Sequence, residues 1–170
     1  MGLLYRQFYG DSSTSTLKAL YITQVRPHLE YATPVWDPHL SKDINALESV
    51  QRFASKVCTK KWRDVSYDER LKLLNIDTLQ SRRSQLKLCY LYKIINGQAY
   101  FINLPLSLFS SVHDTRSHNL TLNVPFTRSV SSFNSFFCQT ARMWNQLPFD
   151  VVSSHTFLSF KKALCNHPFT

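Results

Sequence analysis

Prolines lie within and between two amphipathic helical patterns near the start of the chain, and they limit its fold more than any other feature of the sequence. Pro27 lies inside the first pattern, residues 17–29. Because proline lacks an amide N–H and its ring clashes with the preceding turn, this helix either kinks there or divides into two short helices. Pro34 and Pro38 enclose residues 35–37, and the residue before a proline avoids the helical conformation. The sequence therefore predicts an extended elbow between two helices.

The second helical pattern begins near Ser41, and its apolar residues return at the 3.6-residue period of one helix face. That face comprises Ile44, Leu47, Val50, Phe53, Ala54, Val57 and Cys58. We expect this face to be buried in a core.

Two further helices are predicted in the middle of the chain. Ser66 and Glu69 have the spacing of a capping box, which opens a short helix. Asp77 or Thr78 is expected to cap a longer helix that ends just before Gly97, where a left-handed residue is typical. This longer helix is apolar over more than half of its circumference in its last turns, so we expect it to be central to the core.

The remainder of the chain is more irregular. Residues 98–117 are loop-like, and residues 119–126 alternate polar and apolar side chains, which fits a short strand or extended coil equally well. Residues 131–146 are expected to form a helix that Pro148 stops, and residues 157–165 a last helix.

The expected fold class is mainly α, with an irregular C-terminal region and two further short helices. We expect a helical region over residues 1–97, a loop-rich connector over residues 98–130 and a C-terminal helical region over residues 131–170 that packs on the first.

The net charge of +9 indicates an anionic partner, of which nucleic acid is the commonest. The candidate phosphate contacts are clustered basic residues with no acid among them: Lys60, Lys61, Arg63, Arg82, Arg83 and Lys87. Positive helix faces can hold a duplex by its phosphates. The alternative interpretation is a solvated polar face opposite the core, because every amphipathic helix needs one.

Residue patterns for catalysis are missing from the sequence. It contains no two adjacent Asp residues, no metal-type spacing among its six His, no Cys-x-x-Cys among its four Cys, and too few Gly for a phosphate-binding loop. We therefore expect no catalytic residue and no metal ligand, and buried, reduced cysteines. No apolar run approaches the roughly 20 residues of a membrane span, so we expect no membrane contact and an intracellular location, in the cytoplasm or nucleus.

Trp36 and Trp144 lie beside prolines, and we expect both rings to anchor the core; stacking on nucleobases is the alternative. Glu30 is an acid on an otherwise apolar helical segment. It is expected to pair with Arg26 one turn earlier or to cap a neighbouring helix.

Glu30, Tyr31, Trp36 and Trp144 belong to segments that resemble the reverse transcriptases of non-LTR (LINE-like) retrotransposons. Residues 20–56, LYITQVRPHLEYATPVWDPHLSKDINALESVQRFASK, resemble the thumb of that family, and residues 66–98 resemble the helical segment that follows it. The segments NSFFCQTARMWNQLPFDVV and FLSFKKAL resemble the C-terminal end of these proteins. The segment GLLYRQF, near the start of the chain, resembles their link between palm and thumb. The resemblance covers nearly the whole chain.

The resemblance implies a thumb-like helical bundle that holds template and primer in an RNA-directed DNA polymerase. The family's palm motif ends in two adjacent Asp that bind Mg²⁺, and this sequence lacks them. The chain is thus expected to be a truncated part of such an enzyme, with no cofactor and no polymerase activity of its own. The alternatives are a non-catalytic helical module for nucleic-acid or protein interaction, and an inactive relic.

The expected partner is an RNA or DNA template–primer, bound weakly and without sequence preference. A second expected contact is apolar, with the missing palm or with another copy of the chain. It would use N-terminal residues Leu3, Leu4, Tyr5, Phe8 and Tyr9.

Overall fold

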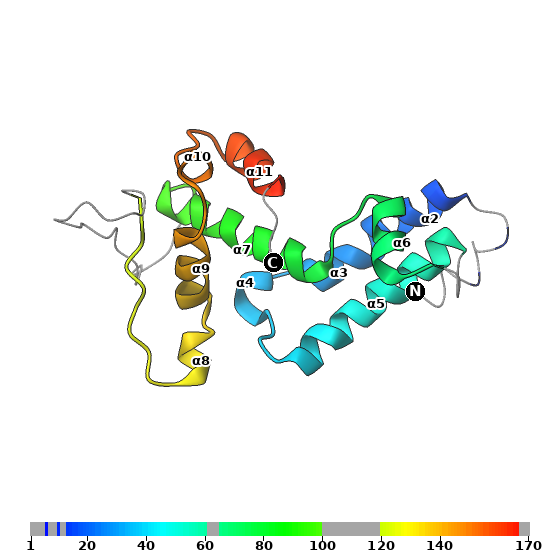
Figure 1. Cartoon of the computed structure of the whole chain (residues 1–170), viewed down its shortest axis with the longest axis horizontal. Helices are drawn as coiled ribbons and strands as arrows, with labels where there is room; N and C mark the ends of the chain where they lie inside the picture. Colours follow the sequence, from blue (N-terminus) through cyan, green and yellow to red (C-terminus); the bar gives the residue numbers. More distant parts are fainter. Residues whose placement is uncertain (1–5, 7–9, 11–12, 61–64, 100–119, 167–170) are drawn as a thin grey trace. The chain divides into compact units, whose positions relative to one another are not determined.

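The computed structural model describes residues 6, 10, 13–60, 65–99 and 120–166, and these residues are mainly helical (Figure 1). The expected mainly-α class is confirmed. The chain divides into two compact units, Met1–Arg83 and Ser84–Thr170. The boundary falls inside helix α7, Leu79–Ile95, and not after residue 97 as expected. The reason is that the later turns of α7 belong to the core formed by the C-terminal helices.

The first pattern of the sequence forms three successive helical pieces: α2 (Thr14–Leu20), a π-helical turn η1 (Tyr21–Val25) and α3 (Arg26–Glu30). The amide of Arg26 donates to the carbonyl of Tyr21, five residues earlier, as a π turn requires. Pro27 follows immediately and has no amide N–H to contribute. The expected interruption at Pro27 is therefore present, as a change of hydrogen-bond pattern in the turn that precedes it.

The elbow is not extended as expected, because residues Thr33–Trp36 form a one-turn helix, α4. Ala32 adopts a left-handed conformation with φ of 50°, which separates α4 from α3. Pro34 lies in the first turn of α4, where a missing N–H costs no helical hydrogen bond.

Helix α5 (Ser41–Thr59) is present as predicted, but its buried face is more polar than expected. Ala54, Val57 and Cys58 are buried, as are Glu48, Gln51 and Ser55, whereas the ring of Phe53 is 37% exposed. The core of this unit joins α2, η1, α5 and α6 through Leu17, Tyr21, Ala54, Cys58 and Leu74.

Helices α6 (Tyr67–Leu74) and α7 begin as the sequence predicts. Ser66 and Glu69 form the reciprocal hydrogen bonds of a capping box, and the Thr78 hydroxyl accepts from the Ser81 amide at 3.2 Å. Gly97, at φ of +66°, follows the end of α7.

The second unit contains α8 (Val130–Phe133), α9 (Phe136–Asn145), α10 (Phe149–Val152) and α11 (Phe157–Cys165). The single helix expected over residues 131–146 is thus two helices, because the Ser135 amide turns back to the Ser132 carbonyl between them. The last helix has the expected bounds and is capped by Thr156.

Aromatic rings from three helices form the centre of this second core. The Tyr92 ring of α7 stacks on Phe160 with centroids 4.4 Å apart, and Trp144 lies 5.8 Å from Phe160 on the other side. The Tyr92 hydroxyl donates to the Ser154 carbonyl at 2.8 Å. The central place expected for α7 and the core position expected for Trp144 are confirmed.

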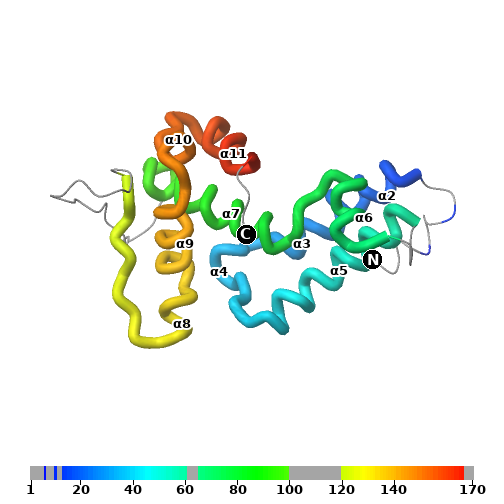
Figure 2. Tube along the Cα trace, viewed as in Figure 1, coloured from blue at the N-terminus to red at the C-terminus, as the bar shows by residue number. Residues whose placement is uncertain are grey.

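The segment before α8 is irregular over its described residues, apart from a single β-bridge residue at Leu122, and runs beside α9 (Figure 2). The Asn145 side-chain amide donates to the Leu122 carbonyl at 2.9 Å and accepts from the Leu122 amide at 2.8 Å. The Trp144 indole donates to the Leu120 carbonyl at 2.9 Å. Two side chains of α9 therefore supply the hydrogen bonds that a neighbouring strand would otherwise give.

Three of the four cysteines, Cys58, Cys89 and Cys138, are buried thiols as expected, but Cys165 is exposed at the end of α11. Burial raises the pKa of the Cys58 thiol to about 11, which keeps it protonated and unreactive at neutral pH. Among the described helices, none is both long and apolar enough to cross a bilayer.

Replacement of Trp144 by Ala should lower the free energy of unfolding by about 3–5 kcal/mol, because the ring is 3% exposed and lies in the aromatic centre. Urea denaturation followed by circular dichroism measures this decrease. Trp36→Ala is the matched control and should cost far less, since its ring is 39% exposed. Equal decreases for the two variants would contradict the assignment of Trp144 alone to the core.

Candidate functional site

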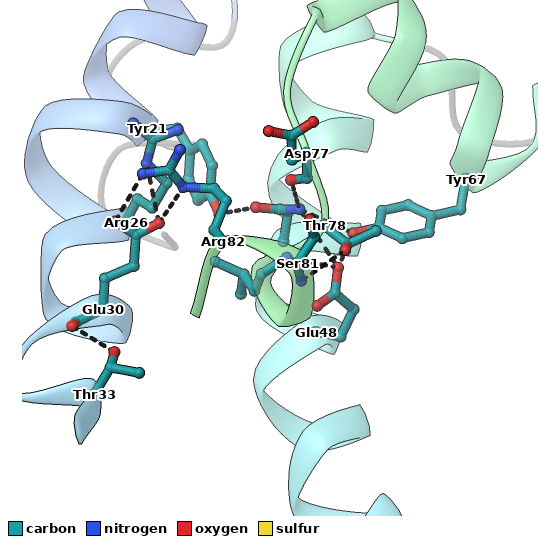
Figure 3. Close-up of polar contacts among 12 residues, drawn as sticks. Tyr21, Arg26, Glu30, Thr33, Glu48, Tyr67, Asp77, Thr78, Ser81 and Arg82 are labelled. Atoms are coloured by element: carbon teal, nitrogen blue, oxygen red, sulfur yellow. Dashed lines mark hydrogen bonds and ion pairs between the residues drawn. The ribbon is translucent and has the colours of Figure 1, made fainter. Parts of the chain in front are cut away.

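Two arginines at the start of α7 form ion pairs with carboxylates on either side of the α3–α4 elbow. Arg82 makes a two-point contact with Glu30, in which the Nη2–Oε2 distance is 3.1 Å, and Arg83 Nε lies 2.7 Å from Asp37 Oδ1. Arg26 also reaches Glu30 at 3.6 Å, which confirms the expected pairing one turn apart. Together these contacts hold the elbow against α7, and Figure 3 shows Arg82 and Arg26 beside Glu30.

The same contacts bear on the expectation that Arg82, Arg83 and Lys87 contact phosphates, because all three hold internal partners. Arg83 is 1% exposed and Lys87 is 3% exposed, with the ammonium of Lys87 donating to Gln139 Oε1 at 2.5 Å. A buried cation is tolerated only beside such partners, and those partners lie 46 and 52 residues away in sequence. Basic spacing along one helix therefore could not distinguish an internal contact from a phosphate contact.

The elbow is well ordered internally yet presents apolar side chains outward. The Thr33 side chain is completely buried, and its hydroxyl donates to the Glu30 carbonyl at 2.7 Å. The indole N–H of Trp36 donates to the Tyr31 carbonyl. Tyr31 is 79% exposed and Val35 is 86% exposed. Trp36 is itself 39% exposed, so the expected core role of its ring is wrong. The ring closes the turn from outside rather than entering a core.

A buried polar cluster surrounds Glu48 of α5, and sequence reasoning did not find it. Glu48 Oε1 accepts hydrogen bonds from the Tyr67 hydroxyl and, at 3.3 Å, from the amide of Leu79, the first residue of α7 (Figure 3). A carboxylate at this position stabilises the positive end of the helix dipole. An acid and a glutamine three residues apart on the apolar side of α5 are the one signal that could have revealed the cluster.

Gln51 connects the cluster to the rest of the unit. Its side-chain carbonyl accepts from the Tyr21 hydroxyl at 2.7 Å, and its amide donates to the Asp77 carbonyl at 2.9 Å and to the Tyr67 oxygen at 3.1 Å. The cluster therefore joins η1, α5, α6 and the start of α7 through hydrogen bonds. Burial raises the pKa of Tyr21, and burial with the hydrogen bond to Glu48 raises the pKa of Tyr67.

A group of basic residues lies in the last turns of α5 and at its end. Arg52 and Lys56 are four residues apart on one side of the helix. Lys60 is the left-handed residue that caps the helix, and its ammonium lies 3.5 Å from the Gly10 carbonyl oxygen. Arg52 and Lys60 are exposed and Lys56 is half-buried. The Arg52 guanidinium also lies over the Tyr67 ring, 5.2 Å from its centroid. We call these three residues the α5 basic ridge.

The other expected site residues fall outside the described part of the chain. Lys61 and Arg63 are two of them, and the N-terminal apolar residues are the others: Leu3, Leu4, Tyr5, Phe8 and Tyr9. Across the described residues, no three His, Cys, Asp or Glu side chains gather in a way that could hold a metal ion. Comparison of the chain with protein-family models, curated proteins and solved structures finds no match.

Removing the charge of Arg83 should destabilise the protein strongly, because it leaves Asp37 without its buried partner. We expect Arg83→Met to lower the free energy of unfolding by about 3 kcal/mol. The double variant Arg83→Met/Asp37→Leu should regain most of that stability in urea denaturation. If the double variant is no more stable than the single one, the ion pair is not the cause.

Stability should fall as the pH rises above about 10, the ordinary pKa of tyrosine. Tyr21 and Tyr67 have raised pKa values, so the folded state holds their protons more tightly than the unfolded state. The stabilisation is therefore complete below pH 10 and is lost as the pH increases. Urea midpoints between pH 8 and 11 should show this decline, and Tyr21→Phe/Tyr67→Phe should flatten it. Tyr31→Phe, which removes an exposed hydroxyl, is the control.

Proposed function

We propose that the chain is a non-catalytic, nucleic-acid-binding helical module of the kind found in the thumb of non-LTR retrotransposon reverse transcriptases. In an intact enzyme of that kind, such a module would hold the template–primer duplex. The resemblance of the sequence, the net charge of +9 and a mainly helical fold support this proposal. Polymerase chemistry is not part of it, because the sequence has no adjacent Asp pair for the metal ions.

The observation that carries the proposal is the α5 basic ridge. Arg52 and Lys56 project from one side of a 19-residue helix, one turn apart, and Lys60 follows as the residue that caps its end. The sequence adds Lys61 and Arg63 directly after it, and no acid intervenes between Glu48 and Asp64. Such a row can follow a line of phosphates and needs no base contacts. Arg82, Arg83 and Lys87 take the different role of holding internal partners.

The proposal predicts weak duplex binding that depends steeply on salt. Because phosphate contacts release counterions, removing one basic side chain from the interface should reduce the slope of log K against log salt by about one. The triple variant Arg52→Gln/Lys56→Gln/Lys60→Gln should therefore lower both the affinity and the slope for a DNA duplex and an RNA–DNA hybrid alike. Fluorescence anisotropy at several salt concentrations measures both quantities.

A matched control removes the same number of charges elsewhere. Arg128, Lys161 and Lys162 are exposed bases of the second unit, and their change to Gln alters net charge equally. If both triple variants show the same decrease in affinity and slope, binding reflects net charge alone and α5 is not the interface. If neither variant changes binding, the proposal is wrong.

A further inference from the structure

The α3–α4 elbow is held unusually firmly for a segment whose apolar side chains face outward. Two arginine–carboxylate pairs, Arg82–Glu30 and Arg83–Asp37, fix it at both ends. Between them, the buried hydroxyl of Thr33 and the indole hydrogen bond of Trp36 fix the backbone of the turn. Ordering a segment in this way lowers the cost of binding something to it, because little conformational entropy remains to be lost.

The partly exposed ring of Trp36 offers a face rather than a hydrogen bond, and Tyr31 adds an exposed ring that also carries a hydroxyl. The indole N–H already donates within the turn, so the ring can take part in recognition only through its π surface. Stacking on a nucleobase needs no more than that surface, and it tolerates any base.

The charges around the elbow also fit a polyanion. Its two acids, Glu30 and Asp37, are each paired with arginine, which removes the repulsion that a phosphate would otherwise meet. Arg26, His28 and Lys42 precede or follow the elbow in the sequence. The net charge of +9 and the α5 basic ridge on the adjoining helix favour a nucleic acid over a purely apolar protein segment.

We propose that Tyr31 and Trp36 form a stacking platform for unpaired nucleobases next to a duplex. The proposal rests on the proposed function and adds the class of substrate, a duplex that carries a single-stranded overhang. The platform precedes the first turn of helix α5, and the α5 basic ridge lies in the second half of that helix and at its end. Helix α5 therefore connects the two. The helix is roughly 28 Å long, which equals the rise of about eight base pairs.

The test compares duplexes of about twelve base pairs that differ only in their overhang. One carries a four-nucleotide overhang with bases and the other an abasic overhang with the same phosphates, so that charge is matched. We expect the full chain to bind the overhang with bases about five- to tenfold more tightly in fluorescence anisotropy, which is within the range for one stacked base. Trp36→Leu and Tyr31→Leu should each reduce this ratio towards one, whereas Trp36→Phe should retain most of it.

Controls separate stacking from loss of structure. Phe126→Leu removes another exposed ring, which is 88% accessible, and should leave the ratio unchanged. Circular dichroism and urea midpoints of each variant show whether it is folded. Tyr31 is so exposed that its replacement provides a folded test even if a Trp36 variant is unstable.

A ratio of one for the parent chain would overturn the stacking proposal, while duplex binding that still depends on the α5 basic ridge would leave the proposed function intact. Absence of binding to every oligonucleotide would overturn both. If Trp36→Leu and Tyr31→Leu instead abolish a self-association seen by sedimentation and leave the ratio unchanged, the elbow is a protein-docking surface and the stacking proposal is wrong.

Discussion

The first unit depends on the pairing of two α7 guanidinium groups with carboxylates from a distant part of the chain. A cation as deeply buried as that of Arg83 is tolerated only where a carboxylate offsets its lost hydration. Asp37 and Glu30 must therefore lie where α7 begins, and that requirement fixes the path of the elbow between α3 and α5. The outward rings of the elbow are a consequence, because its polar side chains point inward to make these pairs.

Glu48 adds a second constraint of the same kind from a different helix. Its carboxylate lies at the first amide of α7, and Gln51 extends the contact to Tyr21, Tyr67 and Asp77. The start of α7 is consequently held by acids on α3, α5 and the elbow. Glu48 Oε2 is buried without a hydrogen-bond partner, but the other contacts of the network still disfavour a shifted helix, which would leave several more groups unpaired.

Four features could be predicted from the sequence: the helical class, the capping box at Ser66, the end of α7 at Gly97 and the core role of Trp144. Each of them depends on neighbours in the chain or on a large apolar ring. The sequence did not allow the burial of Arg83 or Lys87 to be predicted, since their partners are far away along the chain. Of the candidate site, the Arg26–Glu30 pair and the exposed base at the end of α5 could be inferred. The elbow rings and the Glu48 cluster required the tertiary structure.

The π turn before Pro27 affects more than the local hydrogen bonds. Such a turn accommodates one residue beyond the regular count, and one residue of an α-helix corresponds to a rotation of about 100°. Residues after η1 therefore face a different direction from the one they would have in an uninterrupted helix. Glu30 is among them, and its meeting with Arg82 uses that rotation. The number of residues between Tyr21 and Pro27 therefore sets the direction in which the side chains of α3 point. It determines the placement of the elbow as much as the identity of the paired side chains does.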